Sequence, residues 1–146
     1  MRVDFYQLGD APAEQVAVSL SQKVLESGQR LLIVAAEEAC LGRIDRLLWD
    51  QGPASFLPHG VVGSGNDAGQ PILLSRMPDA PNRARNILIA DGEWREAALS
   101  YDRAFYLFGP DSTEGARLAW KLLAGRDGVE RRYWDRGDDG RWSERG

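Results

Sequence analysis

Residues 30–35 read Arg-Leu-Leu-Ile-Val-Ala, which after its first residue is a short and continuous apolar run. Such a run is typical of a β-strand that is covered on both faces, as the strands of parallel sheets are. An amphipathic stretch over residues 37–50 follows, and its inward side chains are expected to be Leu41, Ile44, Leu47 and Leu48. A buried strand that leads directly into a helix indicates an α/β protein with a parallel sheet and right-handed crossovers.

The alternation of strand and helix continues on both sides of this segment. Residues 3–8 have the pattern of a first strand, and residues 13–27 have apolar side chains at helical spacing, with Gly28 after the last turn. The remaining predictions are strands at 71–75, 86–90 and 103–108, a loop over 52–60, and a helix that starts with the capping-box pair Asp111 and Glu114 and ends at Ala124. Residues 129–146 are expected to add a C-terminal edge strand or hairpin. We therefore predict one α/β domain over residues 1–146, with three layers and a mostly parallel sheet flanked by helices.

Composition restricts the setting in which such a domain works. The 146 residues are 43% hydrophobic and 27% charged, which is typical of a globular domain. Because the sequence has no apolar run near the roughly 20 residues that span a bilayer, no membrane segment is expected. The first residues lack the pattern of a signal peptide, and the single cysteine, Cys40, cannot form an internal disulfide. These features predict a cytoplasmic protein.

The charge distribution bears on nucleic-acid binding. The net charge is −4, and residues 1–75 hold 9 acidic and 5 basic side chains, whereas residues 76–146 hold 13 of each. DNA is held mainly by Lys and Arg that neutralise phosphates, so direct binding through a broad basic surface is disfavoured. A local basic pocket in the second half stays open as an alternative.

Enzyme motifs are scarce in this sequence. It has no P-loop, no glycine-rich dinucleotide fingerprint after the first strand, and no Cys or His pairs at metal-ligand spacing, so neither a cofactor nor a metal is expected. The glycine-rich residues 60–67 favour a surface turn over a phosphate cradle, and Cys40 has apolar neighbours, which favours a buried structural role. The alternative hypothesis is a small nucleotide- or cofactor-binding α/β enzyme that uses the crevice near His59, with His59 as general base.

Two groups of side chains are candidate binding sites. Trp49, at the end of the second helix, and Phe56, in the following loop, have the character of a protein–protein contact, although both would also suit a cap over the sheet edge. Arg117, Trp120 and Lys121 share one face of the last helix, where the stripe of Ala116, Ala119, Leu122 and Leu123 is expected to be buried. Two cations beside an indole suit a ligand with a carboxylate next to an aromatic group, and they equally suit a solvated face.

Several of these segments resemble the chi subunits of bacterial DNA polymerase III. The similar segments are residues 3–6 (Val-Asp-Phe-Tyr), 30–34, 45–49 (Asp-Arg-Leu-Leu-Trp), 55–60 (Ser-Phe-Leu-Pro-His-Gly), 71–75 and 86–89, in the order and spacing of the family. The pairing of Leu-Trp at 48–49 with Ser-Phe-Leu-Pro-His at 55–59 is the specific part. The resemblance extends from the first strand to the helix that ends near Ala124.

This resemblance implies a Rossmann-like fold that serves as a connector and has no catalytic activity of its own. Chi proteins link the clamp-loader assembly to single-stranded DNA-binding protein, whose C-terminal tail is acidic and ends in Pro-Phe, so contact with DNA is indirect. Arg117, Trp120 and Lys121 match the positions that receive this tail, although a Tyr is familiar where Trp120 stands. Trp49 and Phe56, with Pro58 and His59, match the contact surface for the psi subunit, or an equivalent clamp-loader subunit, and for a helicase that competes with it.

Overall fold

The computed structural model describes residues 1–51, 57–137 and 139–145. Its strands are β1 (Arg2–Gln7), β2 (Leu31–Val34), β3 (His59–Val61), β4 (Ile72–Ser75), β5 (Asn86–Ile89), β6 (Arg103–Phe108), β7 (Glu130–Arg136) and β8 (Trp142–Arg145). The α-helices are α1 (Ala13–Glu26), α2 (Glu38–Trp49) and α3 (Thr113–Leu123), and the short 3-10 turns are η2 (Asp67–Gly69), η3 (Glu96–Ser100) and η4 (Pro110–Ser112).

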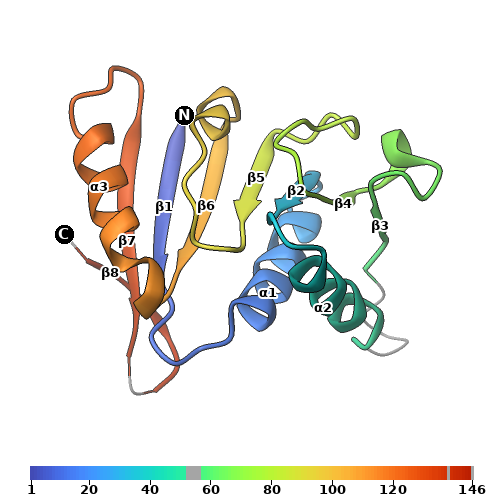
Figure 1. The fold of residues 1–146 in the computed structure, drawn as a ribbon, viewed down its shortest axis with the longest axis horizontal. Helices are drawn as coiled ribbons and strands as arrows, with labels where there is room; N and C mark the ends of the chain where they lie inside the picture. The colour runs from blue at the N-terminus through green and yellow to red at the C-terminus, as the bar shows by residue number, and fades with distance from the viewer. Residues whose placement is uncertain (52–56, 138, 146) are drawn as a thin grey trace.

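The strands form one sheet in the order β3-β4-β2-β5-β6-β1-β7-β8 (Figure 1). Neighbouring strands are parallel throughout, except that β8 is antiparallel to β7. The predicted α/β fold with a mostly parallel sheet is confirmed. The β7–β8 hairpin forms one edge of the sheet, and the short strand β3 forms the other.

Two apolar clusters on opposite faces of the sheet define three layers. Helices α1 and α2 pack on one face, against alternate side chains of β2 such as Leu31 and Ile33. Helix α3 and the turn η3 pack on the other face, against Leu32, Val34 and their neighbours. All four residues of β2 are fully buried, as the continuous apolar run predicted.

Two local predictions are wrong. Residues 52–60 were expected to be a loop throughout, but His59–Val61 form β3, because β4 supplies a parallel partner that no local pattern announces. Residues 52–56 of that predicted loop lie outside the described residues. Asp111 does not cap the last helix: the turn η4 precedes α3, whose N-cap residue is Ser112, and Ser112 Oγ accepts a hydrogen bond from the Gly109 N–H at 3.0 Å.

Other local predictions are confirmed. Gly28 follows α1 with a positive φ of 80°, a conformation that glycine adopts without the strain that a Cβ adds. Of the glycine-rich residues 60–67, Gly60 and Val61 belong to β3 and only the rest form a turn, in which the Asp67 carboxylate accepts the Gly63 N–H at 3.1–3.2 Å. An internal anion thus already occupies this part of the turn. Among the residues that the structure describes, none of the helices is long and apolar enough to cross a bilayer.

Candidate functional site

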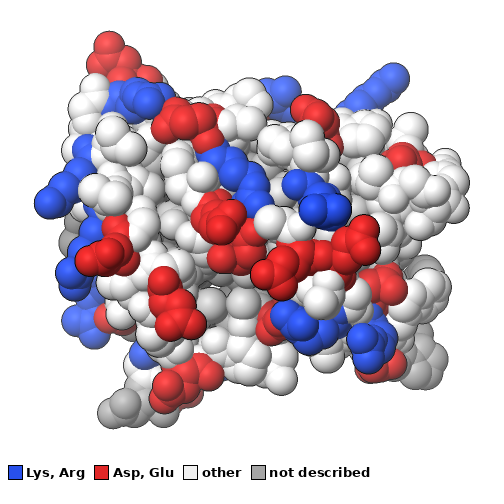
Figure 2. Space-filling view, in the orientation of Figure 1, with Lys and Arg blue, Asp and Glu red and all other residues white. Residues whose placement is uncertain are grey.

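Helix α3 has two sides of different chemistry. The side toward the sheet carries Ala116, Ala119 and Leu123, which are buried. Arg117 and Lys121 are exposed and lie one turn apart on the other side. Figure 2 shows Lys and Arg side chains gathered at the margin of the molecule where α3 and β7 lie.

Trp120 lies at the border between these two sides and is half-buried. Its indole meets the ring of Phe5 on β1 edge-on, with centroids 5.1 Å apart, and the ring of Tyr133 on β7 at 5.8 Å. The guanidinium of Arg131 lies 3.9 Å from the indole centroid, and its Nη1 donates to the Trp120 carbonyl oxygen at 2.7 Å. Trp120 is therefore held in place by three neighbours and presents a fixed aromatic surface beside the two exposed cations.

Arg131 and Tyr133 are site residues that the sequence analysis missed. Strand β7 pairs with β1, and this pairing brings the C-terminal segment next to α3. Burial and the negative charge of Asp135 raise the pKa of Tyr133, and the positive charge of Arg117 opposes this rise. Arg131 packs on the Trp120 indole, Arg117 lies one turn before Trp120, and Lys121 follows it on the exposed side of the helix; these four residues are the α3 surface. The sequence had predicted an edge strand or hairpin over residues 129–146 but not the element next to it.

An exposed apolar pair lies beside the α3 surface. Leu122 was expected to be buried, but it is 61% exposed, and Leu118, one turn before it, is 63% exposed. The expectation failed because Leu122 lies outside the group of α3 side chains that pack on the sheet, which comprises Ala116, Ala119, Trp120 and Leu123. The pair adds apolar area next to Lys121.

The second predicted contact surface lies at the opposite edge of the sheet. Trp49, the last residue of α2, is 60% exposed, and its indole meets the His59 ring at 4.8 Å between centroids. Pro58 is half-buried next to His59. Phe56 lies outside the described residues. The structure thus brings Trp49 and His59 together, and we call Trp49, Pro58 and His59 the α2 edge.

His59 is held by hydrogen bonds that use both of its ring nitrogens. Nδ1 lies 2.8 Å from the carbonyl oxygen of Leu57, and Nε2 lies 2.9 Å from Oδ1 of Asp45 on α2. The His59 side chain is only 1% exposed. A ring that is buried and engaged at both nitrogens has no free position from which to take a substrate proton, so this arrangement does not favour His59 as a general base.

A groove runs between α2 and the edge strand β3, next to the α2 edge. It has a volume of about 460 Å³. Its lining comprises Glu38, Leu41, Gly42, Asp45, Val61, Val62, Leu74, Ser75, Arg76 and Met77. Val62 and Met77 are 40% and 61% exposed, and Trp49 lies one turn beyond Asp45 on the same side of α2. The groove therefore extends the apolar surface around Trp49 along the edge of the sheet.

The crevice at the carboxyl ends of β1, β2, β5 and β6 is where many α/β proteins bind nucleotides. Its lining includes one basic side chain, Arg43, which donates to Glu14 at 2.9 Å, and five acidic ones: Glu14, Glu37, Asp91, Glu93 and Asp111. Cys40 also lines it, and burial raises the pKa of the Cys40 thiol. The predicted buried structural role of Cys40 agrees with its 8% exposure. An acidic crevice disfavours a phosphate, and His59 begins β3, so it lies at the other end of the strands.

The chain is an α/β domain with a half-buried Trp120 beside exposed cations on α3 and an exposed Trp49 at the opposite edge of the sheet. A model of the family described as DNA polymerase III chi subunit, HolC, matches residues 1–129. Because this match covers most of the 146 residues, the chain belongs to the DNA polymerase III chi subunit family. The resemblance found in the sequence is thereby confirmed.

Individual relatives agree with this family. The chain is 30% identical over 82 residues to the DNA polymerase III subunit chi of Escherichia coli (strain K12), and 32% identical over 76 residues to that of Haemophilus influenzae. It is 32% identical over 91 residues to that of Pseudomonas aeruginosa. These matches cover 56%, 52% and 60% of this chain, and 56%, 53% and 62% of the respective relatives. The chain therefore matches somewhat more than half the length of these curated relatives.

Proposed function

We propose that this chain is a non-catalytic adaptor in DNA replication, which links the DNA polymerase III clamp-loader complex to the acidic C-terminal tail of single-stranded DNA-binding protein. Membership of the chi family supports a role within DNA polymerase III, since the relatives are named as its subunits. The observation that carries the proposal is the α3 surface, where Arg131 and Phe5 hold the Trp120 indole on the same helix as the exposed Arg117 and Lys121.

The chemistry of the α3 surface suits such a tail. Guanidinium and ammonium groups bind carboxylates through charge-assisted hydrogen bonds. The indole of Trp120 offers area for the ring of a terminal Phe, and the exposed leucines Leu118 and Leu122 can pack against a Pro. Trp120 replaces a Tyr that is familiar in the family, and stacking is retained. Because both exposed cations face solvent, the affinity for the tail should fall as salt rises.

Isothermal titration with a synthetic acidic peptide that ends in Pro-Phe and a free carboxylate tests this function. Arg117→Ala should weaken binding by about tenfold, the loss expected for one charge-assisted contact. Arg126→Ala is the matched control, because Arg126 is also exposed, lies just beyond α3 and pairs with Glu96 at 3.1 Å. Full binding by the Arg117 variant, or no binding by the unmodified protein, would contradict the proposal.

For the α2 edge we propose a clamp-loader partner, which is the psi subunit or its equivalent, with a helicase as a competitor for the same surface. The exposed indole of Trp49, together with the apolar groove that contains Val62 and Met77, supports this assignment. Trp49→Ala should prevent co-purification of clamp-loader subunits from the native organism. Leu122→Ala removes a side chain of equal exposure from a different surface and should retain them.

A further inference from the structure

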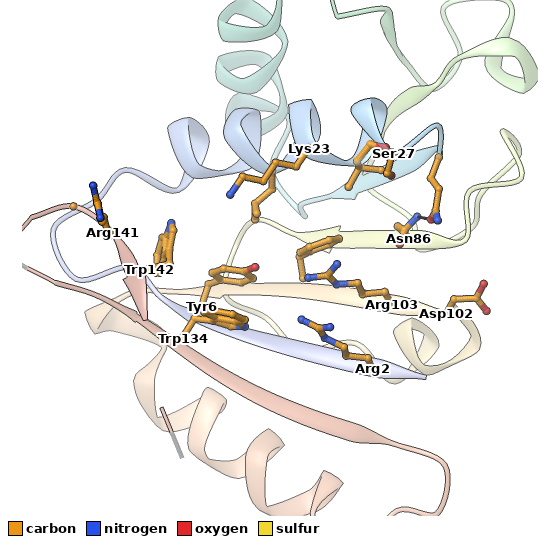
Figure 3. A pocket seen from close by; sticks show the side chains of 15 residues that line it. Arg2, Tyr6, Lys23, Ser27, Asn86, Asp102, Arg103, Trp134, Arg141 and Trp142 are labelled. Atoms are coloured by element: carbon orange, nitrogen blue, oxygen red, sulfur yellow. Dashed lines mark hydrogen bonds between the residues drawn. The ribbon is translucent and has the colours of Figure 1, made fainter. Parts of the chain in front are cut away.

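A cleft that neither proposed partner uses lies on the α1 face of the sheet, and Figure 3 shows its lining. It has a volume of about 810 Å³, which is within the range of small-ligand sites. Helix α1 forms one wall, through Leu20, Lys23 and Val24, and β1, β6, β7 and β8 form the floor and the far end. Among the described residues, four basic side chains line it, Arg2, Lys23, Arg103 and Arg141, together with one acidic side chain, Asp102, whose carboxylate is paired with Arg85 at 2.6 Å.

The floor of the cleft is organised by Asp4, which is fully buried. The Asp4 carboxylate accepts hydrogen bonds from Nε and Nη2 of Arg2 at 2.9–3.0 Å and from Nε of Arg103 at 2.7 Å. It also accepts the indole N–H of Trp134 at 2.9 Å. One carboxylate therefore orients two guanidiniums and an indole. Because a guanidinium carries more N–H donors than these contacts use, both arginines can still donate to a ligand.

Aromatic rings line the same space. Tyr6 and Trp134 are nearly parallel, with an angle of 10° and 6.0 Å between centroids, and Trp142 meets Tyr6 edge-on at 5.1 Å. The guanidinium of Arg103 lies 4.3 Å from the Phe105 ring centroid. Four aromatic rings and four cations thus come together around one hollow. Grooves that bind single-stranded nucleic acid combine these two features, since bases stack on aromatic rings and cations contact the phosphates.

We propose that this cleft binds a nucleotide, with the base against the indoles and the phosphate among the cations. A carboxylate is planar, with two oxygens, whereas the oxygens of a phosphate point in several directions. In Figure 3 Lys23 reaches into the space from α1, and Arg2 and Arg103 lie along the sheet on the opposite side. Donors on opposite sides suit a tetrahedral group better than a planar one. This chemistry is shared by a free nucleotide and by a nucleotide within a single strand.

The acidic net charge of the chain does not conflict with this assignment. A charge of −4 is a sum over the whole molecule and disfavours a broad DNA-binding surface. The cleft concentrates its cations locally. Eight of its lining residues, including the cations Arg103 and Arg141, come from residues 76–146, where a basic pocket had stayed open as an alternative. A cleft of about 810 Å³ holds only a short stretch of a nucleic-acid strand, so only a few phosphates contact its cations. The affinity for a single strand should therefore have a modest salt dependence, with a slope of about −1 to −2 in log–log form.

Fluorescence anisotropy with a labelled oligothymidylate of about ten nucleotides tests the proposal at low salt, and thymidine monophosphate as competitor separates the two sources. Lys23→Glu and Trp142→Ala should each weaken binding by at least about fivefold. Arg46→Glu is the matched control, because Arg46 occupies the last turn of α2 as Lys23 occupies the last turn of α1, and it should change binding by less than about twofold. Circular dichroism should show the same fold for all variants.

Each outcome decides the matter. Displacement of the strand by millimolar thymidine monophosphate assigns the site to free nucleotides, and retention of the strand assigns it to single strands. Absence of binding to both probes overturns the proposal, as does binding that Lys23→Glu and Trp142→Ala leave unchanged. Tighter, Lys23-dependent binding of an acidic peptide would instead make the cleft a peptide site. Tail-peptide binding by the α3 surface should be unaffected in both variants, so this test and that of the adaptor function fail independently.

Discussion

Asp4→Asn is the substitution that most directly tests how the cleft is held together. Asp4 lies on β1 with its side chain fully buried, and it accepts hydrogen bonds from Arg2, Arg103 and Trp134. Asparagine has nearly the same shape, so the packing is preserved and the negative charge alone is lost. One of its two oxygens becomes an NH₂ group, which cannot accept a hydrogen bond and would face a guanidinium donor.

The size of the effect follows from these contacts. Removing one partner of a buried ion pair costs about 3–5 kcal/mol, because the other charge stays without compensation. The side chains of Arg2 and Arg103 are 27% and 35% exposed, so water can take over some of their donors. The amide oxygen still accepts one hydrogen bond. We therefore expect Asp4→Asn to lower the free energy of unfolding by about 2–4 kcal/mol.

Urea denaturation followed by circular dichroism measures this loss. The slope of the free energy with urea should be unchanged, because the same surface becomes exposed on unfolding. Asp102→Asn is the control: it makes the same chemical change in a carboxylate that is 64% exposed and pairs with an exposed Arg85. Its effect should lie within the error of the measurement. If Asp4→Asn were as mild as this control, the view that Asp4 organises the cleft would be refuted.

Three other predictions concern separate parts of the molecule. Gly42→Ala should raise the free energy of unfolding by about 0.5–1 kcal/mol in urea, because Gly42 lies within α2 and a Cβ there would meet no atom within 4 Å; a loss would contradict the open geometry of the groove. Trp120→Ala should lower it by about 3 kcal/mol or more and Trp120→Tyr by less, since the indole packs against Phe5, and equal losses would show that stacking is unimportant. Burial raises the pKa of Tyr6 and of Tyr106 to about 12. Above pH 10 the unfolded chain therefore loses these phenol protons before the folded protein does, and the free energy of unfolding, measured by urea titration, should fall between pH 10 and 12. A free energy of unfolding that is constant over this range would contradict the burial of the two side chains.

Much of the architecture could be predicted from local patterns. The apolar run at 30–35 and the helical spacing of 37–50 identified β2 and α2 to within one residue at each end. Gly28 was placed correctly after α1, because a glycine after the last apolar residue at helical spacing marks the end of a helix. Such features can be identified from residues that are close in the sequence, because a buried helix face and a buried strand face each give apolar residues at a characteristic spacing. The basic and aromatic positions of α3 were visible in the same way, as a spacing on one helix.

The arrangement around those positions depends on contacts between distant segments. Strand β3 exists because β4 pairs with it, and three residues that include a glycine carry no strand pattern of their own. Trp120 acquires Arg131 and Tyr133 as neighbours because β7 pairs with β1, about 130 positions away. Leu122 is apolar and at helical spacing, but it is exposed because the sheet does not extend to the side of α3 on which Leu122 lies.

The cleft shows most clearly which features depend on local sequence and which depend on the tertiary structure. Its basic and aromatic residues are scattered from Arg2 to Trp142, and no spacing in the chain joins them. Each strand's own pattern fixes which side chains face α1, since alternate residues of a strand point to one face of a sheet. Only the strand order decides that β6, β1 and β7 lie next to one another, and this order brings Arg103, Tyr6 and Trp134 around the buried carboxylate of Asp4. Local periodicity thus determines the elements and their faces, whereas strand pairing over long separations determines which faces meet and where a site is formed.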